Sequence, residues 1–178
     1  ERYYKRLVMQ LNRLRVPTIA AVNGVAAGAG ASIAMACDLV IASDKASFLI
    51  PFSKIGLIPD TGASWHLPRA VGQARAMGLA LTARKLSAQQ AADWGLIWET
   101  VAADAFETHV TEVAEQLAIM PTRALVETRE AIKSAGDRTL EAHLSFEAEM
   151  MARLGRSDDY IEGVAAFLEK RAPNFKGL

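Results

Sequence analysis

The sequence has very little cysteine and no excess of charge of either sign. Cys37 is the one cysteine among 178 residues, and 20 acidic residues balance 20 basic ones. One cysteine cannot build a disulfide framework, so we expect a reducing, cytoplasmic location. Without a basic surplus, nucleic acid is not expected as the main partner.

Long apolar runs are also missing. No apolar stretch reaches the roughly 18 residues that a membrane span needs before a charge or a turn interrupts it, so we expect no membrane partner. The histidines His66, His109 and His143 share no metal-ligand spacing, and we expect no metal. What the chain does have is hydrophobic residues, at 51%, which is enough for a substantial core.

The chain begins at Glu1 rather than at a methionine, and core-like elements follow at once. Apolar residues recur at helical spacing over 3–15, and Pro17 ends that helix. The next segment, 18–22, is short, β-branched and apolar, which is typical of a buried strand. A complete protein rarely starts this way, so we expect an N-terminal part of a longer protein to precede Glu1.

The front of the chain alternates between strands and helices, whereas the back is helical. We expect further strands over 38–42, 46–50 and 96–101, and helices over 31–37, 63–67, 73–81 and from 88 with Ser87 as N-cap. Amphipathic helices are expected at about 105–119, 121–135, 139–153 and 161–171, with a polar loop over 156–160. We therefore divide the chain into 1–104 and a helical region, 105–178, whose apolar faces serve either oligomerisation or intrachain packing.

A small-residue turn, Gly28-Ala29-Gly30, opens the helix over 31–37. It could be no more than a tight turn. It does not fit a dinucleotide fingerprint, because Ile33 stands where the last glycine is required, and it lacks the Lys-Ser/Thr pair of a phosphate loop. Such a turn can offer free N–H groups and the positive end of a helix dipole to a developing oxyanion.

A second turn, Ile58-Pro59-Asp60-Thr61-Gly62, places a carboxylate in an apolar run. Asp60 could simply be the N-cap of the following helix. Alternatively, the apolar neighbours Leu57, Ile58 and Trp65 desolvate the carboxylate, which would favour its protonated form and suit it to proton transfer, although the helix dipole acts in the opposite direction. We predict that the Ala29 N–H and the Asp60 carboxylate face one pocket.

Several motifs recur in a family order: AAVNGVAAGAGA (20–31), ACDLVIA (36–42), GLIPDTGA (56–63), LSAQQA (86–91), WGL (94–96) and FLEKR (167–171). Together they resemble the enoyl-CoA hydratase/isomerase (crotonase) superfamily over essentially the whole chain. The resemblance implies an α/β, crotonase-like fold with a (ββα)n spiral core and a C-terminal helical region that trimerises. It also implies an acyl-CoA thioester substrate, a homotrimer or dimer of trimers, and no cofactor, since coenzyme A enters as part of the substrate.

The resemblance assigns the reacting groups. One oxyanion donor is the backbone N–H of Ala29, flanked by Gly28 and Gly30, and the second lies upstream of the chain. The two glutamates that the family's hydratases use fall on Ser32 and Phe52, so simple hydration is not expected.

Asp60 matches the aspartate of several isomerases of the superfamily. Within it, the segments 23–31, 57–60, 74–81, 94–98 and 155–157 are most similar to isomerases of bacterial phenylacetate breakdown, which open an arene epoxide or move a double bond. We therefore predict an acyl-CoA isomerase with one aspartate as acid/base. The alternatives are a hydratase-like enzyme acting on another acyl-CoA and a noncatalytic acyl-CoA-binding subunit.

Further residues are expected to contact the substrate. Phe167 and Lys170 match family positions that reach the adenine and phosphates of coenzyme A, although Lys170-Arg171 could equally be solvated charge. Trp65 and Phe52 line either an acyl pocket or the core. The full predicted binding set is Gly28, Gly30, Ser32, Phe52, Ile58, Trp65, Phe167 and Lys170.

Overall fold

The structure, a computed structural model, describes residues 3–177 and divides into two compact units. The first unit contains Thr18–Val113 with the residues up to Leu14, and the second contains Arg15–Pro17 with the residues from Ala114 onward. The sequence places a boundary after residue 104, where the strands end, and the last strand, β6, is Glu99–Val101. The division into compact units instead falls within the next helix, α5 (Phe106–Ala118).

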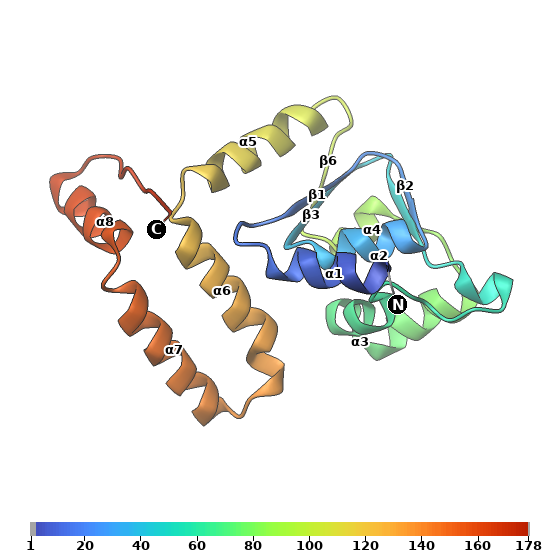
Figure 1. Cartoon of the computed structure of the whole chain (residues 1–178). Helices are drawn as coiled ribbons and strands as arrows, with labels where there is room; N and C mark the ends of the chain where they lie inside the picture. Colours follow the sequence, from blue (N-terminus) through green and yellow to red (C-terminus); the bar gives the residue numbers. More distant parts are fainter. Residues whose placement is uncertain (1–2, 178) are drawn as a thin grey trace. The chain divides into compact units, whose positions relative to one another are not determined.

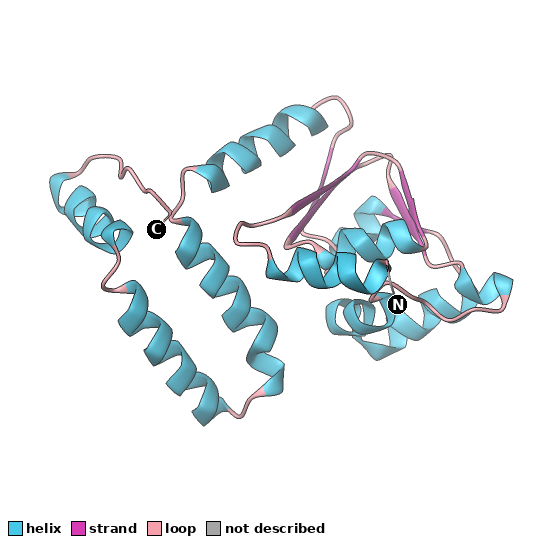
Figure 2. Cartoon of the chain, viewed as in Figure 1, coloured by secondary structure: helices cyan, strands magenta, loops and turns pink. Residues whose placement is uncertain are grey.

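The described part of the first unit holds two small sheets (Figure 2). In one, β1 (Ile19–Val22), β3 (Leu39–Ser43) and β6 lie parallel in the order β1-β3-β6. In the other, β2 (Val25–Ala27) pairs in parallel with β4 (Ser47–Leu49), and β5 (Leu86–Ser87) pairs antiparallel to β4. One sheet is parallel and the other is mixed, and each has three short strands. The faces of such small sheets are covered by helices.

The chain order explains how the two sheets grow together. Strands β1 and β2 precede α2 (Ala29–Ala36), and β3 and β4 precede α3 (Ala63–Thr82), so each repeat contributes one strand to each sheet. Strand β1 pairs with β3, and β2 pairs with β4. The predicted ββα repeat is therefore confirmed.

Helix α2 is packed on most of its sides, as its small residues predict. Ala31, Ser32, Ala34, Met35 and Ala36 are buried, and the helix contacts α3 and the strands β1 and β2. Side chains this small allow neighbouring backbones to approach closely. Leu67 of α3, which is 2% exposed, belongs to the same core cluster as Ala31, Ala34 and Met35 of this helix.

Some elements of the first unit differ from the sequence-based expectations. Strand β2 and a 3₁₀ turn, η1 (Phe52–Ile55), were not expected. The expected helices over 63–67 and 73–81 form one element, α3, but its backbone leaves the helical region at Gly72 (φ +77°, ψ 161°), and Pro68 lies inside it. The first helix, α1 (Tyr4–Arg13), and α4 (Ala88–Asp93) lie where they were expected.

The second unit is helical. It contains the end of α5, then α6 (Thr122–Ser134), α7 (Leu140–Leu154) and α8 (Asp158–Glu169). Helices α6 and α7 contact each other and run antiparallel (Figure 1). The expectation that 156–160 is a loop is wrong: Ser157 Oγ accepts a hydrogen bond from the Tyr160 N–H at 3.2 Å, so α8 begins at Asp158.

Within residues 3–177, no helix combines the length and the apolar character that crossing a bilayer requires.

Candidate functional site

The small-residue turn sits where β2 passes into α2. Gly28 adopts φ +54° and ψ −124°, a conformation that favours glycine, and its N–H donates to the Leu49 carbonyl of β4 at 2.9 Å. Helix α2 starts at Ala29, whose N–H has no acceptor among residues 3–177. The first N–H groups of a helix point out of its end, so this donor is available to a negatively charged oxygen.

Ser32 is a buried residue that hydrogen-bonds to the same turn. Its side chain is fully buried, and both its N–H and its hydroxyl donate to the Gly28 carbonyl at 3.1 Å. The hydroxyl is therefore used within the turn, and substrate contact by Ser32 stays a prediction. Position 32 offers no carboxylate beside the Ala29 N–H.

Phe52 reaches the same turn from the other repeat. It begins η1, three residues after the end of β4, and a β-carbon at Gly28 would lie 3.6 Å from Phe52 Cζ. The two positions on which a hydratase's glutamates would fall, Ser32 and Phe52, thus both lie at the Gly28 turn. The resemblance alone indicated Phe52 as a site residue. The parallel pairing of β2 with β4 explains how it comes to lie beside Gly28.

Asp60 lies in a loop of unusual backbone conformation just before α3. Thr61 has φ +53° and Gly62 has φ +88°, and the Asp60 carbonyl accepts from the Ala63 N–H at 2.9 Å. A positive φ is uncommon in a β-branched residue and costs on the order of 1–3 kcal/mol. Such strain persists only where the surrounding structure fixes it, and it is frequent at functional sites.

The N-cap interpretation of Asp60 is wrong. The residue that precedes α3 is Gly62, and no side chain of residues 3–177 caps the helix. The Asp60 carboxylate instead accepts a hydrogen bond through Oδ1 from the Thr61 hydroxyl at 2.8 Å. Thr61 is the residue of this site that sequence reasoning missed, and the one available signal was a hydroxyl between an aspartate and a glycine in a turn.

The expectation that apolar neighbours bury the Asp60 carboxylate is also wrong for this chain. Asp60 is exposed, and Leu57 and Ile58 beside it are exposed as well, Ile58 to 81%. Trp65 is 54% exposed, with the Arg69 guanidinium 3.3 Å from its ring centroid. The loop therefore presents one carboxylate amid an open apolar surface, and its sharing of a pocket with Ala29 stays a prediction.

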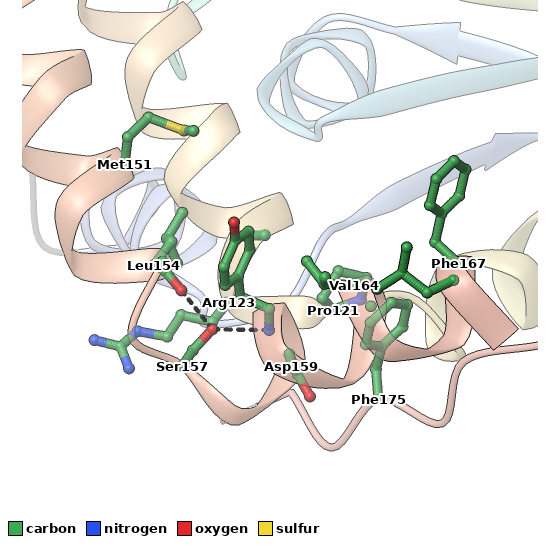
Figure 3. A pocket seen from close by; sticks show the side chains of 14 residues that line it. Pro121, Arg123, Met151, Leu154, Ser157, Asp159, Val164, Phe167 and Phe175 are labelled. Atoms are coloured by element: carbon green, nitrogen blue, oxygen red, sulfur yellow. Dashed lines mark hydrogen bonds between the residues drawn. The ribbon is translucent and has the colours of Figure 1, made fainter.

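The two remaining predicted residues belong to the second unit. Phe167, near the end of α8, lies at an apolar cavity of about 560 Å³ (Figure 3). Other lining residues include Pro121, Met151, Leu154, Val164 and Phe175. Lys170 ends α8 with φ +55°. Their contact with coenzyme A stays a prediction.

Arg171, the other basic residue at this end, is already paired. Its Nη1 and Nη2 lie 2.6 and 2.9 Å from the two carboxylate oxygens of Glu162, and its Nε lies 2.6 Å from Glu169. Hydrogen bonding to Glu162 raises the pKa of Arg171 above its ordinary value. A guanidinium held in this way is not a free phosphate contact.

Histidines and acids do not gather into a metal site within residues 3–177. His109 Nε2 lies 2.7 Å from Glu99 Oε1, and His143 Nε2 lies 3.4 Å from Glu147 Oε1. The His66 ring lies against Gly62, where a β-carbon would be 3.2 Å from His66 Cδ2. Of the three histidines, His66 is the one beside the Asp60 loop.

Comparison with known proteins places this geometry in a family. The model of the enoyl-CoA hydratase/isomerase family matches residues 1–178. A 1,2-epoxyphenylacetyl-CoA isomerase from Escherichia coli (strain K12) is 50% identical over 177 residues, which are 99% of this chain and 68% of that protein. A probable enoyl-CoA hydratase from Rhodobacter capsulatus is 48% identical over 174 residues, which are 98% of this chain and 68% of that protein.

Solved structures agree with the sequence comparison. A putative enoyl-CoA hydratase/isomerase from Mycobacterium abscessus superposes with a TM-score of 0.95 at 35% identity, covering 99% of this chain and 68% of the other. An enoyl-CoA hydratase from Polaromonas gives a TM-score of 0.93 at 36% identity, covering 97% and 67%. This chain therefore spans about two thirds of the length of these relatives and shares their fold over that span.

Proposed function

We propose a function from the premise that this chain belongs to the enoyl-CoA hydratase/isomerase family. The proposed reaction is the isomerisation of an acyl-CoA thioester, in the cytoplasm, with Asp60 as the acid/base and the Ala29 N–H as one oxyanion donor. The substrate is either a 3-enoyl-CoA or an arene epoxide of a CoA thioester. The identity to an epoxyphenylacetyl-CoA isomerase supports the second kind of substrate.

For a 3-enoyl-CoA, the proposed chemistry is a proton shuttle. The Asp60 carboxylate removes a proton from C2, and the electron pair moves through the thioester carbonyl to its oxygen. The Ala29 N–H donates to that oxygen while it carries the charge, which is where a preorganised donor lowers the barrier most. The protonated Asp60 then returns the proton to C4, leaving the double bond between C2 and C3.

One observation carries this proposal: the Asp60 carboxylate does not cap α3 and accepts only the Thr61 hydroxyl within residues 3–177. Hydration needs one group to orient water and another to deliver a proton, but a shuttle needs one group only. Ser32 and Phe52 supply no second acid at the Gly28 turn. The exposed apolar side chains around Asp60 suit contact with an acyl group, and binding one would exclude water from the carboxylate.

The exposure of Asp60 also supports a second candidate, a hydratase-like enzyme in which this carboxylate places a water molecule. The relative from Rhodobacter capsulatus is named a probable hydratase. The two candidates differ in the product. In water enriched in ¹⁸O, a hydratase incorporates the heavy isotope and the isomerisation does not.

The test of the acid/base role is Asp60→Asn in the protein expressed from its complete gene, assayed with a 3-enoyl-CoA and with an arene-epoxide CoA ester. Losing general acid–base catalysis is expected to lower kcat by about 10²- to 10⁴-fold. Asp44→Asn is the matched control, because Asp44 is exposed and its carboxylate pairs with Lys45 alone among the residues that the structure describes. Activity near that of the wild type in Asp60→Asn would remove Asp60 from the mechanism.

We also propose that the second unit serves assembly into a homotrimer or a dimer of trimers. Exposed apolar side chains on α7 and α8, such as Leu140, Met151, Ile161 and Leu168, support an interface there. Sedimentation equilibrium checks this: a monomer at micromolar concentration would contradict it.

A further inference from the structure

We propose that Thr61 is a positioning residue, which holds the Asp60 carboxylate in one orientation for proton transfer. This inference rests on the proposed acid/base role of Asp60. Thr61 does not contact substrate in this proposal; it acts through Asp60. Both the side chains of the loop and its backbone support this role.

The Thr61 side chain links an exposed carboxylate to the interior. Its hydroxyl donates to Asp60 Oδ1 at 2.8 Å, and Thr61 is only 9% exposed whereas Asp60 is exposed. Hydrogen bonds to an ionised acceptor are among the stronger ones in proteins. An exposed aspartate would otherwise sample several side-chain rotamers, so this bond selects those that keep Oδ1 toward Thr61.

The backbone gives Thr61 little freedom to move away. The Ala63 N–H donates to the Asp60 carbonyl, and the His66 N–H donates to the Gly62 carbonyl, both at 2.9 Å. Gly62 itself is covered by the His66 ring. The residue that carries the hydroxyl is therefore fixed on both sides within a short loop.

The residue type at position 61 is unfavourable for its conformation. With φ at +53°, glycine or asparagine would be less strained than threonine. Neither of those residues has a hydroxyl. The hydrogen bond to Asp60 is a physical reason for a β-branched hydroxyl residue at a position that its backbone disfavours.

The two carboxylate oxygens of Asp60 therefore have different roles in this proposal. Oδ1 is occupied by Thr61, while Oδ2 has no donor among residues 3–177 and is the oxygen left to carry the proton. Holding Oδ2 in the orientation that proton transfer requires lowers the entropic part of the reaction barrier. Substrate binding does not depend on this hydrogen bond in the proposal. Loss of the Thr61 hydroxyl should therefore lower kcat and leave KM nearly unchanged.

The decisive variant is Thr61→Val, which keeps the shape and the β-branching but removes the hydroxyl. In the protein expressed from its complete gene, we expect kcat to fall about 10-fold, the usual worth of a hydrogen bond to a charged group, with KM within about twofold. Thr61→Ser restores the hydroxyl, and kcat should return to within about threefold of the wild type. Thr82→Val is the matched control, since the Thr82 hydroxyl donates to the Gly78 carbonyl of α3 and to no other group in the described part of the chain, and this variant should behave as the wild type.

Each contrary outcome has a separate meaning. A wild-type kcat in Thr61→Val, or a Thr61→Ser variant as slow as Thr61→Val, overturns the positioning role. If Asp60→Asn keeps activity, the proposed function fails and this inference fails with it. If Asp60→Asn is inactive and Thr61→Val is fully active, only this inference fails. Should circular dichroism show Thr61→Val unfolded, Thr61→Ala replaces it, with the same kcat and KM expected.

Discussion

The ring of Phe52 lies beside the backbone of Gly28, where a β-carbon would be 3.6 Å from its Cζ and 3.9 Å from its Cε2. The two residues belong to successive repeats, one following β2 and the other following β4. Because β2 and β4 are parallel, with Ala27 opposite Leu49, both strands end at the same edge of the sheet. Ligands of open α/β sheets bind beyond such carboxyl ends, which is where the Ala29 N–H is presented.

Gly28→Ala is expected to destabilise the protein by about 1–3 kcal/mol, because alanine is strained at φ +54° and ψ −124°. The Phe52 ring leaves ordinary contact room for the new methyl group, so the cost is one of backbone conformation. Relaxation of the turn would also redirect the Ala29 N–H and lower kcat. Urea unfolding and steady-state kinetics measure the two effects.

Gly30→Ala is the matched control for that prediction. Gly30 lies inside α2, and a β-carbon there would meet no atom within 4 Å from other segments of the described chain. Alanine in a helix is favoured over glycine by roughly 0.5–1 kcal/mol, so this variant should be as stable as the wild type or more so. Equal losses in Gly28→Ala and Gly30→Ala would contradict the special conformation of Gly28.

Leu67→Ala should cost about 2–5 kcal/mol, because Leu67 is 2% exposed and its removal leaves a cavity between α2, α3 and the strands. Leu81→Ala on the same helix is the comparison. Leu81 is 69% exposed, so its truncation should change stability by no more than about 0.5 kcal/mol. The measurement is the urea unfolding midpoint of the two variants. Equal midpoints would contradict the burial of Leu67 and the exposure of Leu81.

Much of this fold follows from local sequence patterns. The β-branched and apolar runs predict β1, β3 and β4, and Pro17 and Ser87 mark where elements end or begin. The sequence does not predict strand β2, because its three residues are too few to show a periodicity and they form a strand by pairing with β4. The contact between Phe52 and the Gly28 turn also depends on this nonlocal strand pairing, so local sequence patterns do not predict it.

The candidate site was predictable in its residues more than in its interactions. Asp60 and Ala29 come from motifs, but the Thr61 hydrogen bond depends on a positive φ that sequence propensity argues against. Helix capping by Asp60 was the more ordinary expectation, and the left-handed pair Thr61 and Gly62 prevents it by placing Gly62 at the N-cap. Strained backbone is thus what separates the observed loop from the expected one.

Ser157→Ala is expected to destabilise the second unit by about 1 kcal/mol, because the Ser157 hydroxyl caps α8 by accepting from the Tyr160 N–H. Ser145→Ala on α7 is the control: its hydroxyl bonds the Glu141 carbonyl within the helix, a bond that contributes little. Hydrogen exchange of the first-turn amides of α8 localises the effect. Unchanged protection there in Ser157→Ala would argue that the helix does not begin at Asp158.

A pH-dependent prediction concerns Glu162 in the second unit. The pKa of Glu162 is lowered from an ordinary 4.5 to about 2, mainly by the hydrogen bond from Arg171 and then by that from the Asn174 N–H. A carboxyl group whose pKa is depressed by folding stabilises the folded state above its unfolded pKa and loses that contribution as the pH falls. The contribution is therefore complete at neutral pH and disappears between about pH 4.5 and about pH 2.

Thermal unfolding of the wild type and of Glu162→Gln across this range provides the measurement. The wild type should have the higher Tm at pH 7, and the difference should shrink below pH 4.5 and vanish near pH 2. Added salt should also reduce it at pH 7, because this ion pair reaches the solvent. Glu149→Gln is the control, since Glu149 is exposed on α7 and its side chain has no hydrogen-bond or ion-pair partner among the described residues. A Tm difference that is independent of pH would show that Glu162 acts through packing and not through its charge.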